Sequence, residues 1–153
     1  MKKYYSVDLE LSGKNVGKHS ILSIGACIVG ERGKQFYREL KPLSFEHSER
    51  AMRAGSMGLQ CLTPKLRKSS NYDPEHRFFR PDLVLKLLYK EGFSPEEAMK
   101  ELLGWIDQTR DQAEPILLAK PIIVDIPFIH WYAKKYCGGL GCLSEDGIED
   151  LEE

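Results

Sequence analysis

The order of the strand and helix patterns is the feature that most constrains the fold of this chain. Three stretches near the N-terminus have the apolar content and turn-bounded ends of β-strands: residues 2–11, 19–30 and 34–43. Two helix patterns, a short apolar strand and a last helix follow: residues 81–92, 94–110, 115–120 and 125–139. Because a glycine-containing connection joins the second and third strands, we expect a hairpin there. The order predicts an α/β fold whose sheet is mixed, with three antiparallel strands and then a parallel strand, flanked by helices.

Two helices carry clear start signals. At 94–110, Ser94 is suited to cap the helix, Pro95 fits its first position, and Glu97 completes a capping box. In the last helix, Asp125 stands at the expected N-cap position and Pro127 falls in the first turn. The region between the third strand and the helix at 81–92 is less regular. We expect a short helix at 48–55 and a polar loop at 63–81.

Charge is distributed unevenly along the 153 residues. Residues 143–153 hold six acidic side chains and no basic one, whereas residues 1–142 carry 22 basic and 17 acidic side chains. We therefore expect one domain over 1–142, followed by a solvated acidic tail over 143–153. A moderately basic body is compatible with a polyanionic partner.

The composition also bounds the protein's location. No apolar run approaches the roughly 20 residues that span a bilayer, and the N-terminus turns acidic where a secretory signal needs its apolar region. We therefore expect a cytoplasmic protein without membrane contact. The four cysteines match no zinc pattern: Cys27, Cys61, Cys137 and Cys142. Free thiols are expected in that compartment, and a disulfide between the last two is the alternative.

The stretch "VDLELSG" places two carboxylates on one strand face. Successive side chains of a strand alternate between faces, so Asp8 and Glu10 lie side by side, where they repel and where partial burial raises a pKa. A third acid, Asp125, comes directly after the later apolar strand. Because ligands bind at the carboxyl ends of parallel strands, these acids are candidates for one site. The alternatives are a solvated acidic pair and a plain helix cap.

Taken together, the motifs resemble the DEDD superfamily of 3′–5′ exonucleases, which have a ribonuclease H-like fold. "VDLELSG" and "ILSIGACIV" are similar to its first motif, and "FYRELKPL" to its third strand. "GFSPEEAMKELLGWI" resembles the helix before its second motif, and "ILLAKPIIVDIPFIHWYAKKYCGG" resembles the motif itself. The similarity covers about residues 4–140, with the order of elements preserved.

The resemblance implies a metal-dependent 3′–5′ exonuclease. Asp8, Glu10 and Asp125 would ligate two divalent ions, Mg²⁺ or Mn²⁺, which activate a water and stabilise the leaving 3′ oxygen of a phosphodiester. The implied partner is the 3′ end of single-stranded DNA or RNA. The segment that follows the acidic pair is implied to lie against the terminal nucleotide: Leu11, Ser12 and Gly13.

The sequence departs from the superfamily pattern in its third motif. The family supplies a fourth aspartate, with a His or Tyr shortly before it, from a later helix, and the 153 residues contain no such helix. Glu149 and Asp150 are the candidate substitutes for that carboxylate, and His19 is a candidate base. His130 lies five positions after Asp125, so on a helix it points about 140° away from it.

Three functions therefore remain open: an exonuclease impaired by the missing motif, a non-catalytic relative that binds nucleic acid or protein, and an endonuclease with the same metal chemistry. A further candidate for nucleic-acid contact is the polar loop, which mixes basic and aromatic residues: Lys65, Arg67, Lys68, Tyr72, Arg77, Phe78, Phe79 and Arg80. The alternative is a solvated loop with its aromatic rings in the core.

Overall fold

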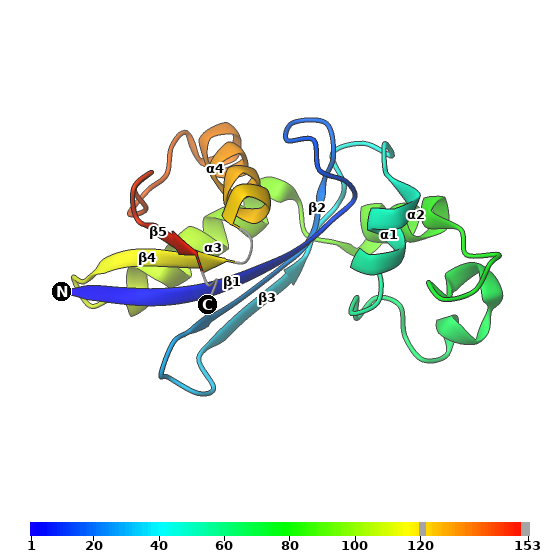
Figure 1. Cartoon of the computed structure of the whole chain (residues 1–153), viewed down its shortest axis with the longest axis horizontal. Coiled ribbons are helices and arrows are strands. Elements are labelled where there is room, and N and C mark those ends of the chain that lie inside the picture. Colours follow the sequence, from blue (N-terminus) through cyan, green and yellow to red (C-terminus); the bar gives the residue numbers. More distant parts are fainter. Residues whose placement is uncertain (120–121, 151–153) are drawn as a thin grey trace.

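The computed structural model describes residues 1–119 and 122–150, and within them the strands form one mixed sheet (Figure 1). The strands are β1 (Lys2–Leu11), β2 (Ile21–Ile28), β3 (Gln35–Glu39), β4 (Glu114–Ala119) and β5 (Ile148–Asp150). Their order across the sheet is β3-β2-β1-β4-β5. The first three strands are antiparallel, β4 runs parallel to β1, and β5 runs parallel to β4. The predicted ribonuclease H-like mixed sheet is confirmed.

The helices agree closely with the sequence patterns. They are α1 (Glu49–Gly55), α2 (Pro81–Glu91), α3 (Pro95–Thr109) and α4 (Ile122–Cys137), with short 3₁₀ turns η1 (Leu66–Lys68) and η2 (Ser70–Tyr72). The Ser94 hydroxyl accepts a hydrogen bond from the Glu97 N–H at 3.1 Å, which confirms the predicted cap of α3. In the described ranges, every helix is too short or too polar to cross a membrane.

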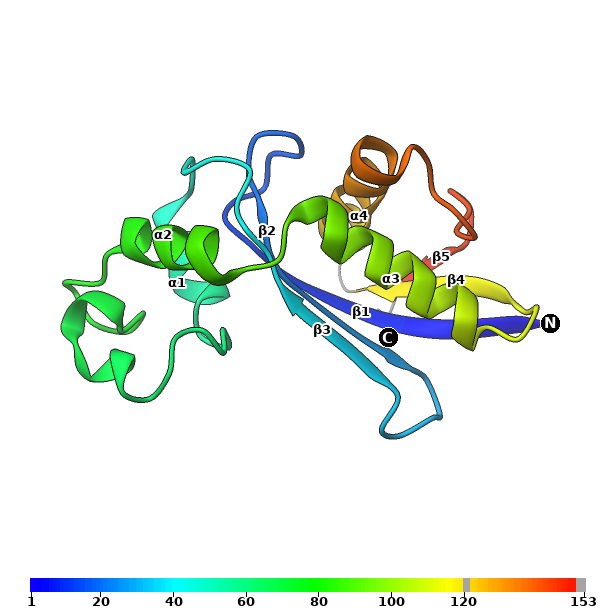
Figure 2. The same cartoon turned by 180° about the vertical axis from the view of Figure 1, so that it is seen from behind.

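Two apolar clusters hold the chain together. The larger cluster lies between the sheet and α3 and α4, where Tyr5, Val7 and Leu9 of β1 point to the same face. Figure 2 shows α3 crossing in front of β1 and β4 on this side of the sheet. The smaller cluster fills a lobe formed by residues 49–91, including α1 and α2, which extends beyond the strand ends (Figure 1). The four cysteines are all free thiols.

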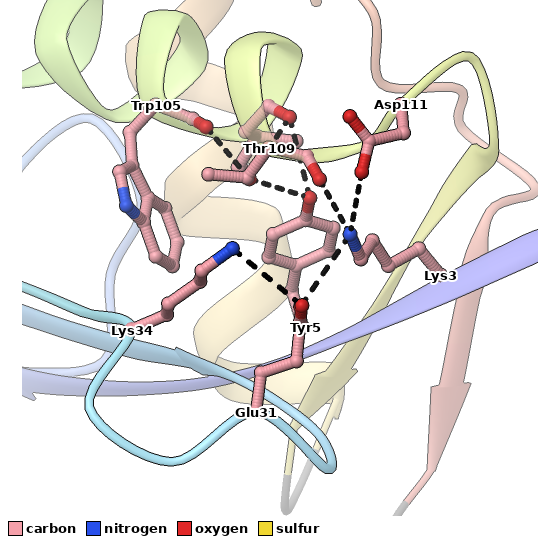
Figure 3. Close-up of polar contacts among 8 residues, drawn as sticks. Lys3, Tyr5, Glu31, Lys34, Trp105, Thr109 and Asp111 are labelled. Atoms are coloured by element: carbon pink, nitrogen blue, oxygen red, sulfur yellow. Dashed lines mark hydrogen bonds and ion pairs between the residues drawn. The ribbon is translucent and has the colours of Figure 1, made fainter.

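A polar network anchors the beginning of β1, as Figure 3 shows. The Tyr5 hydroxyl shares a hydrogen bond with Thr109 Oγ1 at 2.7 Å, and Lys3 Nζ donates to the Thr109 carbonyl at 2.5 Å. Lys3 also lies 3.4 Å from a carboxylate oxygen of Glu31, in the β2–β3 connection. These contacts tie β1 to the end of α3 and to the hairpin, so the strand is fixed at the end opposite its carboxylates.

The start of α4 corrects one prediction. The helix begins at Ile122, so Asp125 lies in its first turn and is not the N-cap. The reason is that the Asp125 carboxylate accepts a hydrogen bond from the main chain of β1 instead of capping its own helix. Residues 120 and 121, which precede the helix, lie outside the described residues.

The acidic segment differs from the expected solvated tail over its described part. Leu143 is buried in the larger cluster, and β5 pairs with Leu117–Ala119 of β4. The Leu117 N–H donates to the Gly147 carbonyl at 2.9 Å, which leads the chain into this pairing. Apolar residues spaced among the acids therefore return the chain to the sheet, while the acidic side chains of Glu145 and Glu149 stay exposed.

Candidate metal centre

The candidate site forms where β1 extends beyond its parallel neighbour. Pairing between β1 and β4 ends at Ser6 and Leu118, and β1 continues to Leu11. Past that point, Asp125 takes the place of a strand partner: its Oδ2 accepts the Leu9 N–H at 3.3 Å. Since Leu9 lies between Asp8 and Glu10, this hydrogen bond brings the third carboxylate beside the pair. The structure thus brings together the three acids predicted from the sequence.

The three carboxylates differ in their exposure. Asp8 is exposed, Glu10 is half-buried, and Asp125 is buried, with 7% of its surface exposed. Asp125 is fixed by its bond to the main chain, whereas Asp8 is open to solvent. The site therefore combines one anchored carboxylate with one that is open to solvent.

Glu10 owes its burial to the end of α1. A Cβ added at Gly55 would lie 3.5 Å from Glu10 Oε2 and 3.2 Å from the Leu11 carbonyl oxygen. Glycine therefore suits this close approach of the helix to the strand, since a Cβ would press against the Leu11 carbonyl. The sequence suggested Gly55 as a helix terminator, and its contact with Glu10 is a role that sequence reasoning missed, because no local pattern joins residues 10 and 55.

Burial and mutual repulsion shift the pKa values of two of the acids. Burial, and then the negative charges of Asp8 and Asp125, raise the pKa of Glu10 to about 7. Burial and the charge of Asp8 raise the pKa of Asp125 to about 6, against the lowering effect of the Leu9 N–H. The site therefore concentrates negative charge that a bound cation would relieve.

The donor set fits a hard divalent cation in chemistry and in charge, since carboxylate oxygens are the ligands that Mg²⁺ and Mn²⁺ prefer. The arrangement is not a closed cage. Within residues 1–119 and 122–150, no three His, Cys, Asp or Glu side chains converge closely enough to hold an ion as they stand.

Among the described residues, no fourth carboxylate influences the pKa of Glu10 or Asp125, so the acid implied by the resemblance has no counterpart there. Glu149 is exposed on β5, in register with Leu118, and the side chain of Asp150 lies outside the described residues. His130 is half-buried elsewhere on α4, where burial lowers its pKa and where the nearby carboxylate is that of Glu145. This agrees with the helical geometry that turns His130 away from the acids.

Ser12 holds the segment that follows β1 in place through hydrogen bonds within the protein. Its side chain is fully buried, and its hydroxyl accepts the Ser20 N–H at 2.8 Å. Its carbonyl accepts the Ser48 N–H at 2.8 Å, just before α1. The predicted contact of Leu11, Ser12 and Gly13 with a terminal nucleotide stays a prediction, and the Ser12 hydroxyl is already engaged within the protein.

Gly13 is packed against a histidine ring. A Cβ at this position would lie 2.2 Å from His19 Nδ1, so any other residue would displace the ring. His19 Nδ1 in turn accepts the Asn15 N–H at 3.0 Å. This bond leaves Nε2 as the nitrogen of His19 that is free to meet a ligand.

The basic and aromatic residues of the polar loop divide into two groups. Arg67 donates to the carbonyl oxygens of four residues, and this bracing is structural: Ser56, Met57, Leu59 and Leu62. Phe79 is buried and Tyr72 packs against the smaller cluster. Phe78 is 55% exposed, with the Arg77 guanidinium 4.7 Å from its ring centre. Only part of the predicted surface is therefore available to a partner.

Comparison with known proteins finds a nuclease among the proteins similar to this chain. Over 136 residues the chain is 29% identical to the protein named 3′-5′ DNA exonuclease Cap18 of Escherichia coli, a match that covers 88% of this chain. The chain spans 59% of the length of that relative. No family model matches the chain.

Two solved structures of exonuclease I have the same fold. The product-bound structure superposes with a TM-score of 0.61 at 11% identity, and a second structure with 0.59 at 9% identity. Each match covers 99% of this chain, and 30% and 28% of the respective exonuclease I chains. The relative supports the predicted resemblance to 3′–5′ exonucleases, and the two structures show the fold that this resemblance implies.

Proposed function

We propose that this chain is a metal-dependent nuclease that removes nucleotides from the 3′ end of a nucleic acid. The observation that carries the proposal is the proximity of three carboxylates from β1 and α4 at the C-terminal end of the central strand: Asp8, Glu10 and Asp125. Similarity to a protein named as a 3′-5′ DNA exonuclease supports it. The reaction is hydrolysis of the terminal phosphodiester.

The residues divide the work according to their surroundings. Two divalent ions, Mg²⁺ or Mn²⁺, would supply water activation and stabilisation of the leaving 3′ oxygen. Asp125, held by the Leu9 N–H, would keep a fixed carboxylate at the base of the site. Glu10, held against Gly55, would close one side, and exposed Asp8 would complete the oxygen set from the solvent side.

Cleavage by residues 1–153 is expected to be slow. Three carboxylates and water can complete the shell of one ion, whereas a second ion without its fourth aspartate binds weakly. A missing His or Tyr removes a further contribution of roughly 10²–10⁴-fold, typical of a general base. Appending a helix that carries an aspartate should therefore raise the rate by orders of magnitude.

Digestion of a 5′-labelled single strand with Mn²⁺ tests the proposal. We expect stepwise shortening from the 3′ end, its loss in EDTA and in Asp8→Asn or Asp125→Asn, and its retention in Asp107→Asn, which alters an exposed acid on α3. A circular strand should survive. Cutting of the circle would instead assign the protein to the endonucleases, and unchanged digestion by Asp8→Asn would refute the carboxylate site.

A second candidate is a non-catalytic relative that binds nucleic acid. The observation that favours it is that, in the part of the chain that the structure describes, the acids do not form a ready cage for an ion. The two candidates separate in the same assay. A chain that binds the strand and leaves it intact, with Mn²⁺ and with an appended aspartate helix, is the non-catalytic relative.

A further inference from the structure

A groove lined by aromatic rings and lysines lies beside the loop that follows β1. Its volume is about 380 Å³, and its lining includes six residues from four separate segments: Gly17, Lys41, Tyr89, Trp131, Lys135 and Tyr136. We call it the aromatic–lysine groove. Figure 2 shows the loop after β1 at the top of the view, between α2 and α4.

The groove pairs positive charge with flat rings. Lys135 Nζ lies 5.3 Å from the centre of the Trp131 ring and 5.9 Å from that of Tyr136. Lys41 Nζ lies 5.6 Å from the centre of the Tyr89 ring. No acidic residue is among the described residues that line this groove. Its surface is therefore suited to a ligand that carries both negative charge and planar groups.

Two exposed rings connect the groove to a second hollow. Phe45 meets Tyr89 edge to face, with ring centres 6.1 Å apart, and both rings are exposed, by 46% and 60%. Phe45 also lines a second hollow of about 330 Å³ together with Lys18 and His19. The groove, the two exposed rings and the second hollow together form a path. One end of this path lies at the loop that follows Glu10, because the His19 ring packs on Gly13.

A single-stranded nucleic acid is the ligand whose chemistry matches this path. Its bases are splayed and can stack on exposed rings, and its phosphates can meet lysines, whereas the bases of a duplex are stacked on each other. Among the described residues that line the groove and the second hollow, the one acid is Glu46. Three lysines line them: Lys18, Lys41 and Lys135. We propose that the aromatic–lysine groove holds the single strand that leads away from the reacting 3′ end. This rests on the proposed function, because it names a second contact surface for the same substrate.

Binding of a 5′-fluorescein oligothymidylate of about 20 nucleotides, followed by anisotropy in EDTA, tests the stacking contact. Loss of one base-stacking ring should weaken binding by about tenfold in Tyr89→Ala, and Tyr89→Phe should retain wild-type affinity. Phe78→Ala is the matched control, because it removes an equally exposed ring from the polar loop. A larger loss in Phe78→Ala than in Tyr89→Ala would overturn the proposal in favour of that loop.

The phosphate contact is tested by salt. Lys135→Gln should lower the slope of log affinity against log salt by about 0.7, the value for one phosphate contact on a single strand. Lys100→Gln, which changes an exposed lysine on α3, should leave the slope unchanged. An oligonucleotide of about 3 nucleotides, too short to follow the path, should bind wild type and both variants alike. Equal slopes for Lys135→Gln and wild type would contradict the groove.

These measurements are independent of cleavage. One outcome is that Tyr89→Ala weakens oligonucleotide binding by the Asp8→Asn protein in EDTA, while the wild type with Mn²⁺ digests nothing. In that case the groove stands and the proposed function fails. If the strand is digested while Tyr89→Ala binds it as tightly as wild type, the groove is refuted and the proposed function stands. A wild-type chain without measurable affinity for the long strand also refutes the groove.

Discussion

The sheet half of the molecule and the lobe of residues 49–91 are ordered by different interactions. In the sheet half, alternating apolar residues of the strands pack against α3 and α4 in one cluster. In the lobe, a smaller cluster is supplemented by two arginines that donate to main-chain carbonyls. Arg53 reaches Pro74 and His76, and Arg67 braces the chain just after α1. The strand that carries Asp8 and Glu10 is thus held by periodic apolar packing. The helix that packs against Glu10, α1, belongs to a lobe that is held in part by hydrogen bonds from arginine side chains to main-chain carbonyls.

The largest effect is expected where the two regions touch. Gly55→Val would place side-chain atoms against the Leu11 carbonyl and Glu10 Oε2, so it should displace a carboxylate and lower nuclease activity by about 100-fold, the typical cost of a misplaced group. Gly58→Val is the control, since a Cβ there meets nothing within 4 Å. Initial rates of oligonucleotide shortening measure both variants. Equal rates would show that the lobe does not shape the site.

Stabilisation by Mn²⁺ tests the carboxylate site in the sheet half. A single-site ligand at about 100 times its Kd stabilises a protein by about 2.7 kcal/mol, so Mn²⁺ should raise the melting temperature of the wild type. Asp8→Asn should lose this shift, and without metal it should be as stable as the wild type or more so, because one repulsive charge is gone. Thermal melts in EDTA and in Mn²⁺ give the answer. The same Mn²⁺ shift in both proteins would disprove a shared metal site.

Arg67→Met tests the polar bracing of the lobe. The change keeps the apolar stem and removes hydrogen bonds to the carbonyls of Ser56 and Leu62, so we expect a loss of about 2 kcal/mol. Arg110→Met removes a surface pair with Asp107 from the sheet half and should cost less than about 1 kcal/mol. Urea unfolding gives both values, and hydrogen exchange should show the loss of protection confined to the lobe. Uniform loss across the sheet would indicate that the two regions unfold as one.

The smallest effect concerns pH. Because the folded pKa of Glu10 is about 7, above its ordinary value of 4.5, the folded state holds a proton that the unfolded state has lost between these values. In EDTA, the stability from this group is complete below pH 4.5 and lost as pH rises through 7. Allowing for the half-exposed side chain, we expect Glu10→Gln to recover about 1 kcal/mol at pH 8. Because the pKa of Asp125 is also raised, part of the dependence of stability on pH should remain in Glu10→Gln. Identical pH profiles would mean that neither burial nor the neighbouring carboxylates raise the pKa of Glu10.

The sequence predicts those parts of the molecule whose order is local or periodic. The alternation around Asp8 predicted the face of β1, and the Ser94 cap predicted the start of α3. The position of Asp125 beside β1 was anticipated, but not its role as an acceptor for the Leu9 N–H, since a carboxylate before a proline resembles a cap in any single stretch. The groove was not predicted, because Tyr89 and Trp131 come from separate segments that only the fold brings together.

The pairing of β1 with β4 has a consequence for synthesis of the protein. β1 finds its antiparallel partner β2 within the first 28 residues, but β4 begins only at Glu114. Closing a loop of that length is slow relative to forming a hairpin, so the two pairings arise at separate times as the chain leaves the ribosome. Asp125 emerges later still. A nascent chain therefore carries Asp8 and Glu10 without their third partner until α4 has been synthesised, so any hydrolytic competence arises only after that helix has formed.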